Sequence, residues 1–146
     1  MKTNELLHQL QASLTVFYAN LKNFHWNLVD QNFLVIHKYT DKLAQKTNDF
    51  IDEVAEKIRA LDEIAFASFA EIQQNAKLEF LQARVWNGFD VINEIAAQIK
   101  IILQICEKIQ GKNISFAVTT ILPLIDELII FYHKELWKVN AQLPKS

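Results

Sequence analysis

The sequence predicts an all-α protein, a bundle of four long helices with a short extra helix in the connection between the second and the third. Three observations lead to this prediction. Apolar residues recur every three or four positions over four long stretches, as they do on the buried face of an amphipathic helix. Glycine and proline number only two each, so little interrupts those stretches. A length of 146 residues fits a single domain covering residues 1–146.

The first two long helices are expected over about Asn4 to Val29 and about Phe33 to Leu61. A polar break of three residues, Asp30 to Asn32, separates them, and the Asn32 side chain is expected to cap the second helix. The apolar row of the first helix is Leu7, Leu10, Leu14, Phe17, Leu21, Phe24 and Leu28. The row of the second is Ile36, Tyr39, Leu43, Phe50, Val54, Ile58 and Leu61, with Thr47 as a weak position.

The short helix is expected at about Phe69 to Ala76, with Ser68 as its cap. The third long helix follows Asn87 and Gly88 and stops near Gly111. Its apolar row is Ile92, Ile95, Ile99, Ile102, Cys106 and Ile109. Short connections join the first helix to the second and the third to the fourth, as is usual in a four-helix bundle.

The fourth long helix contains the apolar positions Ile125, Leu128, Tyr132, Leu136 and Val139 and ends before Pro144. Pro123 is expected either to kink this helix or to lie in its first turn, because proline has no backbone N–H. His133 follows the core position Tyr132 and is expected to be partly buried.

The composition excludes several classes of function. A formal charge of −2 gives no electrostatic footprint for nucleic acid. The longest uncharged stretch, Asn113 to Ile125, has thirteen residues and is too short to cross a bilayer. No secretory signal is expected at the N-terminus, and a single cysteine suits a reducing compartment, so a cytoplasmic protein is expected. A hydrophobic content of 51% suggests that other copies of the chain cover some apolar surface.

A polar row follows the apolar row of the second helix: His37, Asp41, Gln45, Asn48, Asp52, Glu56 and Arg59. One interpretation is an ordinary solvated face, and the other is a metal site. His37 and Asp52 lie about 22 Å apart along a helix, so they cannot bind one metal within a single chain. Two antiparallel copies of the helix about a two-fold axis would bring His37 of one copy near Asp52 and Glu56 of the other. His25, across the break, could reach the same place.

The segment "KNFHWNLVDQNFLVIHKYTDKLAQKTNDFIDEVAEKIRAL" resembles the signature of the Dps family, the ferritin-like miniferritins named for DNA-binding proteins from starved cells. The family pattern is an HWN tripeptide, a histidine twelve residues after the first, an aspartate four further on, and a D-x-x-x-E pair. The matching positions here are His25, His37, Asp41, Asp52 and Glu56. Near the end, "LWKVNAQL" resembles the family's closing segment, so the likeness covers most of the chain.

The resemblance implies a ferroxidase that oxidises Fe(II), characteristically with hydrogen peroxide, and stores ferric mineral in a hollow dodecamer built from two-fold dimers. It thereby protects against oxidative damage. His25 and His37 of one subunit would bind iron together with Asp52 and Glu56 of the mate, with Asp41 as an auxiliary acid. Imidazoles suit Fe(II) and carboxylates favour Fe(III), and the same mixed set also suits zinc.

Two residues beside these positions, Trp26 and Lys22, are not expected to be metal ligands. The resemblance implies that Trp26 takes up a stray oxidising equivalent, and its alternative role is packing at the dimer interface. Lys22, three residues before His25, is a candidate to pair with a carboxylate across the interface and is not expected to bind metal.

The chain also departs from the family pattern. Family members often have acidic residues that line three-fold pores at the start of the fourth helix. No acid lies between Asn113 and Ile125, and Pro123 stands where an aspartate is common. Asp126 and Glu127 could substitute only if the helix begins after Pro123. The missing acids favour a second hypothesis, a structural or adhesive cage that binds a metal such as zinc but stores little iron.

No strong DNA binding is expected, since Lys2 alone precedes the first helix and only residues 144–146 follow the fourth. A within-bundle di-iron site is not expected either, because the single E-x-x-H, Glu5 to His8, has no second copy. Glu5 and His8 are interpreted as a surface pair, and Cys106 as a core residue without nucleophilic function.

Overall fold

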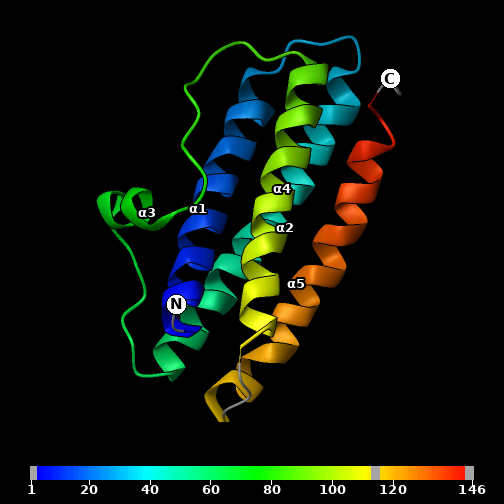
Figure 1. Ribbon diagram of the computed structural model, residues 1–146. Helices are drawn as coiled ribbons and strands as arrows, with labels where there is room; N and C mark the ends of the chain where they lie inside the picture. The colour runs from blue at the N-terminus through cyan, green and yellow to red at the C-terminus, as the bar shows by residue number, and fades with distance from the viewer. Residues whose placement is uncertain (1–2, 113–115, 144–146) are drawn as a thin grey trace.

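The computed structural model describes residues 3–112 and 116–143, and every regular element in these ranges is a helix. The elements are α1 (Thr3–Asn27), α2 (Phe33–Ala60), α3 (Phe69–Asn75), α4 (Gly88–Gln110) and α5 (Phe116–Asn140). The four long helices lie side by side, and the short α3 stands outside them in the connection between α2 and α4 (Figure 1). The predicted four-helix bundle with an extra short helix is therefore confirmed.

The topology follows from the lengths of the connections. The short connection at residues 28–32 makes α1 and α2 an antiparallel hairpin, and α4 and α5 also run antiparallel (Figure 1). The long connection through α3 runs back along the outside of the bundle, so α2 and α4 point in the same direction. The end of α1 and the beginnings of α2 and α4 consequently lie at one end of the molecule.

The predicted apolar rows form the core. Leu7, Leu10 and Leu14 of α1 and Phe50 and Val54 of α2 are all fully buried. Each such side chain contributes roughly 1.5–3 kcal/mol relative to an exposed position. Thr47, the weak position of its row, is also buried, and its Oγ1 lies 2.8 Å from the Tyr132 hydroxyl. A polar residue fits there because its hydroxyl has a partner on α5.

The ends of two helices confirm one predicted cap and correct another. Ser68 caps α3 as predicted, since its Oγ accepts a bond from the Glu71 N–H while Glu71 accepts one from the Ser68 N–H. The Asn32 prediction is wrong, because its side chain makes no capping bond. Asp30 instead orders this turn by accepting from the Asn32 N–H at 2.9 Å.

The structure also decides between the two predicted places for Pro123. This residue lies inside α5, seven positions after Phe116, so the first-turn alternative is wrong. Because α5 begins before Pro123, the condition under which Asp126 and Glu127 would replace the missing pore acids is not met. Residues 113–115, part of the acid-free stretch, lie outside the described residues. His133 is exposed rather than partly buried, because the residue after Tyr132 points away from the core.

Candidate metal site at the junction of α1 and α2

The α1–α2 hairpin brings His25 and His37 together, although twelve residues separate them in sequence. His25 lies in the last turn of α1 and His37 near the start of α2. Their rings stack, with centroids 3.8 Å apart and planes 9° from parallel. Phe33 stacks on the His37 ring at 4.8 Å. Both imidazoles are therefore packed in fixed orientations, half-buried at one end of the bundle.

Each of these histidines is held by the backbone of the other. His25 Nδ1 lies 2.7 Å from the His37 carbonyl oxygen, and His37 Nδ1 lies 2.8 Å from the His25 carbonyl oxygen. A carbonyl oxygen only accepts, so both Nδ1 atoms donate and carry the proton. In the neutral imidazole the lone pair is then on Nε2, the state in which histidine binds metals.

Asp41 lies beside the pair, one turn after His37. Its Oδ1 is 3.3 Å from Lys22 Nζ and 3.9 Å from His25 Nε2, and its Oδ2 accepts a bond from Gln45 Nε2 at 3.1 Å. A separation of 3.9 Å is too long for a hydrogen bond. A small approach would bring the two atoms to the separation of about 3.4 Å that two ligands of one tetrahedral ion have at bonds of about 2.0–2.2 Å. Lys22 thus pairs with a carboxylate of its own chain, and its pairing across an interface stays a prediction.

Asp52 and Glu56 are not brought to this place. Both are exposed on α2, further along the helix. Within the described residues, no group of three or more His, Cys, Asp or Glu side chains is arranged to hold a metal ion. A single chain therefore places His25 next to His37 and next to Asp41 without completing a metal site among the described residues, and it leaves the other two predicted ligands apart. The contribution of Asp52 and Glu56 to a shared site stays a prediction.

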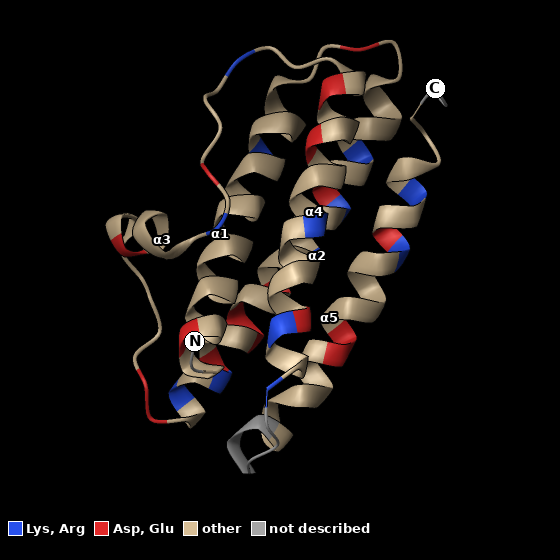
Figure 2. Ribbon diagram, viewed as in Figure 1, with Lys and Arg blue, Asp and Glu red and all other residues tan. Residues whose placement is uncertain are grey.

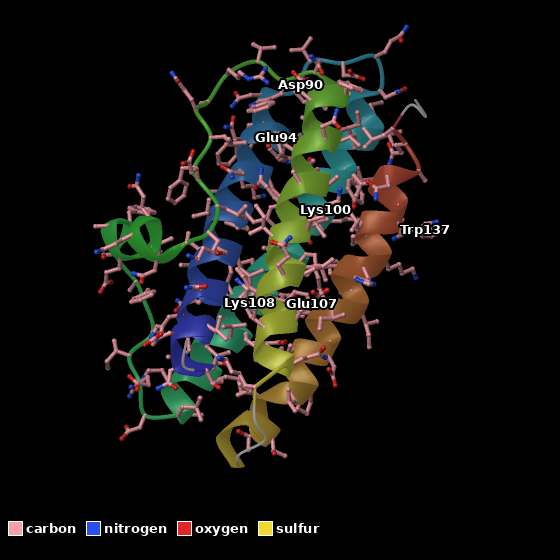
Figure 3. The ribbon with its side chains drawn as sticks, viewed as in Figure 1. Asp90, Glu94, Lys100, Glu107, Lys108 and Trp137 are labelled. Atoms are coloured by element: carbon pink, nitrogen blue, oxygen red, sulfur yellow. The ribbon has the colours of Figure 1, made fainter. Side chains whose placement is uncertain are left out.

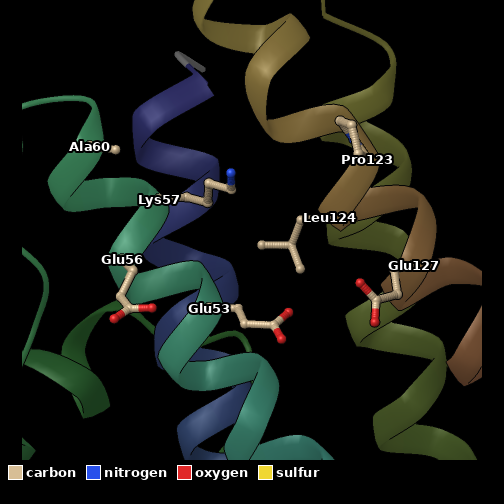
Figure 4. A pocket seen from close by; sticks show the side chains of 7 residues that line it. All are labelled: Glu53, Glu56, Lys57, Ala60, Pro123, Leu124 and Glu127. Carbon is tan, nitrogen blue, oxygen red and sulfur yellow. The ribbon is translucent and has the colours of Figure 1, made fainter.

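Glu56 borders a hollow of about 410 Å³ between α2 and α5. Figure 4 shows the side chains of Glu53 and Glu56 on α2 and of Pro123, Leu124 and Glu127 on α5 around it. Lys46 lies 3.8 Å from Glu127 and offsets part of the negative charge. Glu127 is therefore an acidic group on α5, one turn after Pro123. It faces α2 rather than the N-terminal end of α5.

Exposed apolar side chains lie close in sequence to the histidine pair. Trp26, next to His25, is 70% exposed, and Val29, Leu34 and Val35 are exposed by 67–79%. An apolar group of this kind on a protein surface is typical of a contact with another protein. Its position fits the packing role of Trp26, and the role in taking up oxidising equivalents stays a prediction.

Sequence reasoning missed two features of the site. Thr40 is fully buried beside His25, with its Oγ1 3.2 Å from His25 Nδ1. Its position one turn after His37 was the available signal. The apolar residues Val29, Leu34 and Val35 fall outside the core rows, and this irregularity was the available signal for their exposure.

The remaining candidates have structural roles. The His8 nitrogens contact the carbonyl oxygens of Asn4 and Ile64 at 2.8 and 2.7 Å, so its partners are backbone groups rather than Glu5. Cys106 is buried, and this burial, together with nearby Glu107, raises the pKa of its thiol to about 12. Such a thiol is not a nucleophile at neutral pH.

Comparisons with known proteins place this geometry in context. The family model described as Ferritin-like domain matches residues 4–143. The DNA protection during starvation protein of Helicobacter pylori is 24% identical over 143 residues, which cover 98% of this chain and 99% of the relative.

Two solved structures are similar over nearly the whole chain. CAIP of Helicobacter cinaedi is 26% identical with a TM-score of 0.92, covering 98% of this chain and 100% of that one. The Dps protein of Vibrio cholerae, described as one of the ferritin-like diiron-carboxylate proteins, is 23% identical with a TM-score of 0.88, covering 96% and 87%. No helix among the described residues is long and apolar enough for a membrane span.

Proposed function

Because the chain belongs to the ferritin-like family and, within it, to the Dps miniferritins, we propose that it oxidises Fe(II) at centres shared between two copies and stores the ferric product in a hollow shell. The family supports the iron-storage role. The preference for hydrogen peroxide, the twelve-subunit shell and the shared centres are parts of the proposal. They are the features that the resemblance of the sequence implies.

One observation supports the centres most directly. The reciprocal bonds between the Nδ1 atoms and carbonyl oxygens of His25 and His37 leave both Nε2 lone pairs available. These two nitrogens bind Fe(II), the substrate, from one subunit. Asp52 and Glu56 of the two-fold mate supply carboxylate oxygens, which are harder ligands and favour the Fe(III) product. Asp41 offers a further carboxylate oxygen 3.9 Å from His25 Nε2.

The chemistry balances with two iron ions and one peroxide. Each Fe(II) loses one electron, and hydrogen peroxide accepts both electrons and two protons to give two molecules of water. Bringing two iron ions to one centre allows this two-electron step without release of a hydroxyl radical. Oxidation of iron at the centre therefore also removes peroxide, which accounts for protection against oxidative damage.

The experiment that tests the centre replaces both distant acids, as Asp52→Ala with Glu56→Ala. Ferric absorbance is followed after Fe(II) and peroxide are added to the apo-protein. We expect fast oxidation to disappear, while circular dichroism and thermal unfolding stay close to wild type because both residues are exposed. The pair Asp49→Ala with Glu53→Ala, from the same helix, is the matched control. Rapid oxidation by the first variant would rule out the proposed ligands.

A second function is a cage that binds zinc or another metal and stores little iron. The acid-free stretch at the start of α5 favours it, since Fe(II) would be attracted only weakly to a pore there. Sedimentation after stepwise addition of Fe(II) and peroxide separates the two functions. Shells that load hundreds of iron ions support storage, whereas loading that stops at a few ions per dimer supports the cage.

The proposal extends to DNA and to location. Twelve copies at −2 each would carry −24, which repels phosphate, so no strong DNA binding is proposed at physiological salt. A mobility shift that persists at that salt would contradict this. A cytoplasmic location is proposed, because the single cysteine suits a reducing compartment.

A further inference from the structure

Thr40 is a buried polar residue for which the proposed chemistry has no direct use. Its side chain is fully buried on α2, one turn after Ile36 and His37. The Oγ1 atom lies 3.0 Å from each of the carbonyl oxygens of these two residues. The same atom lies 3.2 Å from His25 Nδ1 on α1. One hydroxyl thus connects the backbone of α2 to the imidazole that ends α1.

The hydrogen-bond chemistry of these four atoms allows one consistent assignment. A hydroxyl has one proton to donate and two lone pairs that accept. The two carbonyl oxygens only accept, so the Thr40 proton goes to one of them, as is common for threonine in a helix. The lone pairs of Oγ1 then face His25 Nδ1–H, which donates mainly to the His37 carbonyl oxygen at 2.7 Å and secondarily to Thr40.

We propose that Thr40 is a positioning residue of the metal site, whose hydroxyl is a second acceptor beside the His37 carbonyl oxygen and helps to hold the His25 ring in its orientation with the proton on Nδ1. The consequence is that the Nε2 lone pair stays available to a metal ion. The inference depends on the proposed function for the identity of that ion. The orientation and the tautomer of His25, however, are properties of the protein without metal and are measured separately.

Two variants, Thr40→Val and Thr40→Ser, distinguish the proposed role from a purely structural one, because the two roles predict opposite orders of damage. Thr40→Val has nearly the same shape but lacks the hydroxyl, whereas Thr40→Ser keeps the hydroxyl and loses a methyl group. If Thr40 only fills space, the serine variant is the more damaged one. If the hydroxyl positions His25, the valine variant loses function and the serine variant retains it.

The first measurement is made on the apo-protein. Nitrogen-15 NMR of the imidazoles distinguishes Nδ1–H from Nε2–H tautomers, and a His25→Gln variant identifies the His25 signals. We expect His25 to carry its proton on Nδ1 in the wild type and in Thr40→Ser. In Thr40→Val we expect a second population with the proton on Nε2. An unchanged tautomer in Thr40→Val would overturn the proposal.

The second measurement is titration with Co(II), which reports binding through its visible absorption. Loss of a group that orients a metal-binding histidine typically lowers affinity by about 10- to 100-fold. We expect a loss in this range for Thr40→Val and a change below about threefold for Thr40→Ser. Equal affinity of the wild type and the valine variant would also overturn the proposal. If no variant, including the wild type, oxidises Fe(II), the proposed function fails while the NMR result still decides the role of Thr40.

Discussion

Asp41 carries a carboxylate oxygen that two different groups approach. Its Oδ1 lies 3.3 Å from the Lys22 ammonium and 3.9 Å from His25 Nε2. Lys22 therefore neutralises Asp41 in the single chain. A divalent ion bound between His25 and Asp41 would compete with the ammonium for the same oxygen, because both are cations close to one carboxylate.

Replacing Lys22 should therefore strengthen metal binding. For Lys22→Met we expect the affinity for Zn(II), measured by isothermal titration, to rise by a factor of roughly two to five, since a partly exposed ion pair contributes at most about 1 kcal/mol. Lys38→Met removes a positive charge from an exposed position of the same hairpin and is the control. Weaker binding by the Lys22 variant would show instead that the ammonium organises the site.

The residue scale shows which parts of the site the sequence could reveal. The spacing of His25 and His37 follows the family pattern, and the hairpin brings the two together. Their Nδ1 partners could not be predicted, because backbone carbonyl groups are present at every position and leave no mark in a sequence. The pairing of Lys22 with Asp41 depends on how α1 packs against α2, which periodicity alone does not determine.

The turn between α1 and α2 contacts the start of α4 through Asp30 and Gly88, at the end of the bundle that holds the two histidines. Asp30 Oδ1 accepts a bond of 2.7 Å from the N–H of Gly88, the first residue of α4. The backbone approaches so closely here that a Cβ on Gly88 would lie 2.8 Å from Asp30 Oδ1 and 2.8 Å from Ile36 Cδ1. The start of α4 is thereby fixed to the turn between His25 and His37.

Substitution of this glycine tests the close contact. We expect Gly88→Ala to lower the free energy of unfolding by roughly 1 kcal/mol, because the added methyl group displaces the Asp30 carboxylate that accepts from the Gly88 N–H. Gly111→Ala is the matched control, because its Cβ would meet only ordinary contacts of 3.5 Å or more at a helical backbone angle. That variant should be neutral or slightly stabilised. Urea unfolding of both gives the comparison, and equal stabilities would contradict the close packing at Gly88.

The same turn predicts a dependence on pH. The backbone N–H groups of Asn32 and Gly88 lower the pKa of Asp30 from its ordinary value of 3.8. Stability from this ionised carboxylate is thus fully present above pH 3.8 and is lost as the pH falls through the lower folded pKa. We expect the wild type to be more stable than Asp30→Asn near pH 6 and the difference to shrink toward pH 2. Thermal unfolding across this range measures it, and a constant difference would exclude the ionised carboxylate as the cause.

At the scale of elements, the sequence predicted every helix and missed details at their ends. The apolar rows predicted the four long helices because their buried faces repeat over many turns. The first helix ends at Asn27, two residues earlier than expected, because Leu28 pairs with Trp86 in an isolated bridge. Asp30 rather than Asn32 orders the next turn because it also reaches Gly88, 58 residues away in sequence. Such long-range partners give no local signal.

The whole molecule presents a surface that fits contact with further copies. Charged residues of both signs are scattered over α2, α4 and α5, without a region of one sign in this view (Figure 2). Trp137 projects outward from α5 (Figure 3) and is 68% exposed, and Ile130 on the same helix is 71% exposed. With the exposed residues near Trp26, they are apolar side chains that the core of a single chain does not bury.

If the centre is shared between two chains, two inactive variants should recover part of the activity when they form mixed dimers. One variant carries His25→Ala and His37→Ala, and the other carries Asp52→Ala and Glu56→Ala. A mixed dimer would contain one intact centre, with histidines from the second variant and acids from the first. Random pairing in equal amounts should restore about a quarter of the wild-type rate of Fe(II) oxidation.

Co-expression with two different affinity tags provides the mixed dimers. The control co-expresses a chain that carries Asp52→Ala with a separate chain that carries Glu56→Ala. No centre in their mixed dimers contains both acids, so these dimers should stay inactive. Absence of recovery in the first mixture, with mixed dimers present, would mean that the ligands do not come from two chains. The sequence predicts such sharing through the distance between His37 and Asp52 and through the family resemblance, and not through periodicity, which does not encode the fit between two surfaces.

The reciprocal attachment of the two imidazoles to main-chain oxygens gives each ring one acceptor that sequence drift does not remove. Every amino acid supplies a carbonyl group, so no point substitution deletes either acceptor. An insertion or deletion in the turn at residues 28–32 acts differently, because it shifts one helix relative to the other and separates both pairs at once. The length of that turn, more than the identity of its residues, should therefore be the feature that lineages of this protein keep.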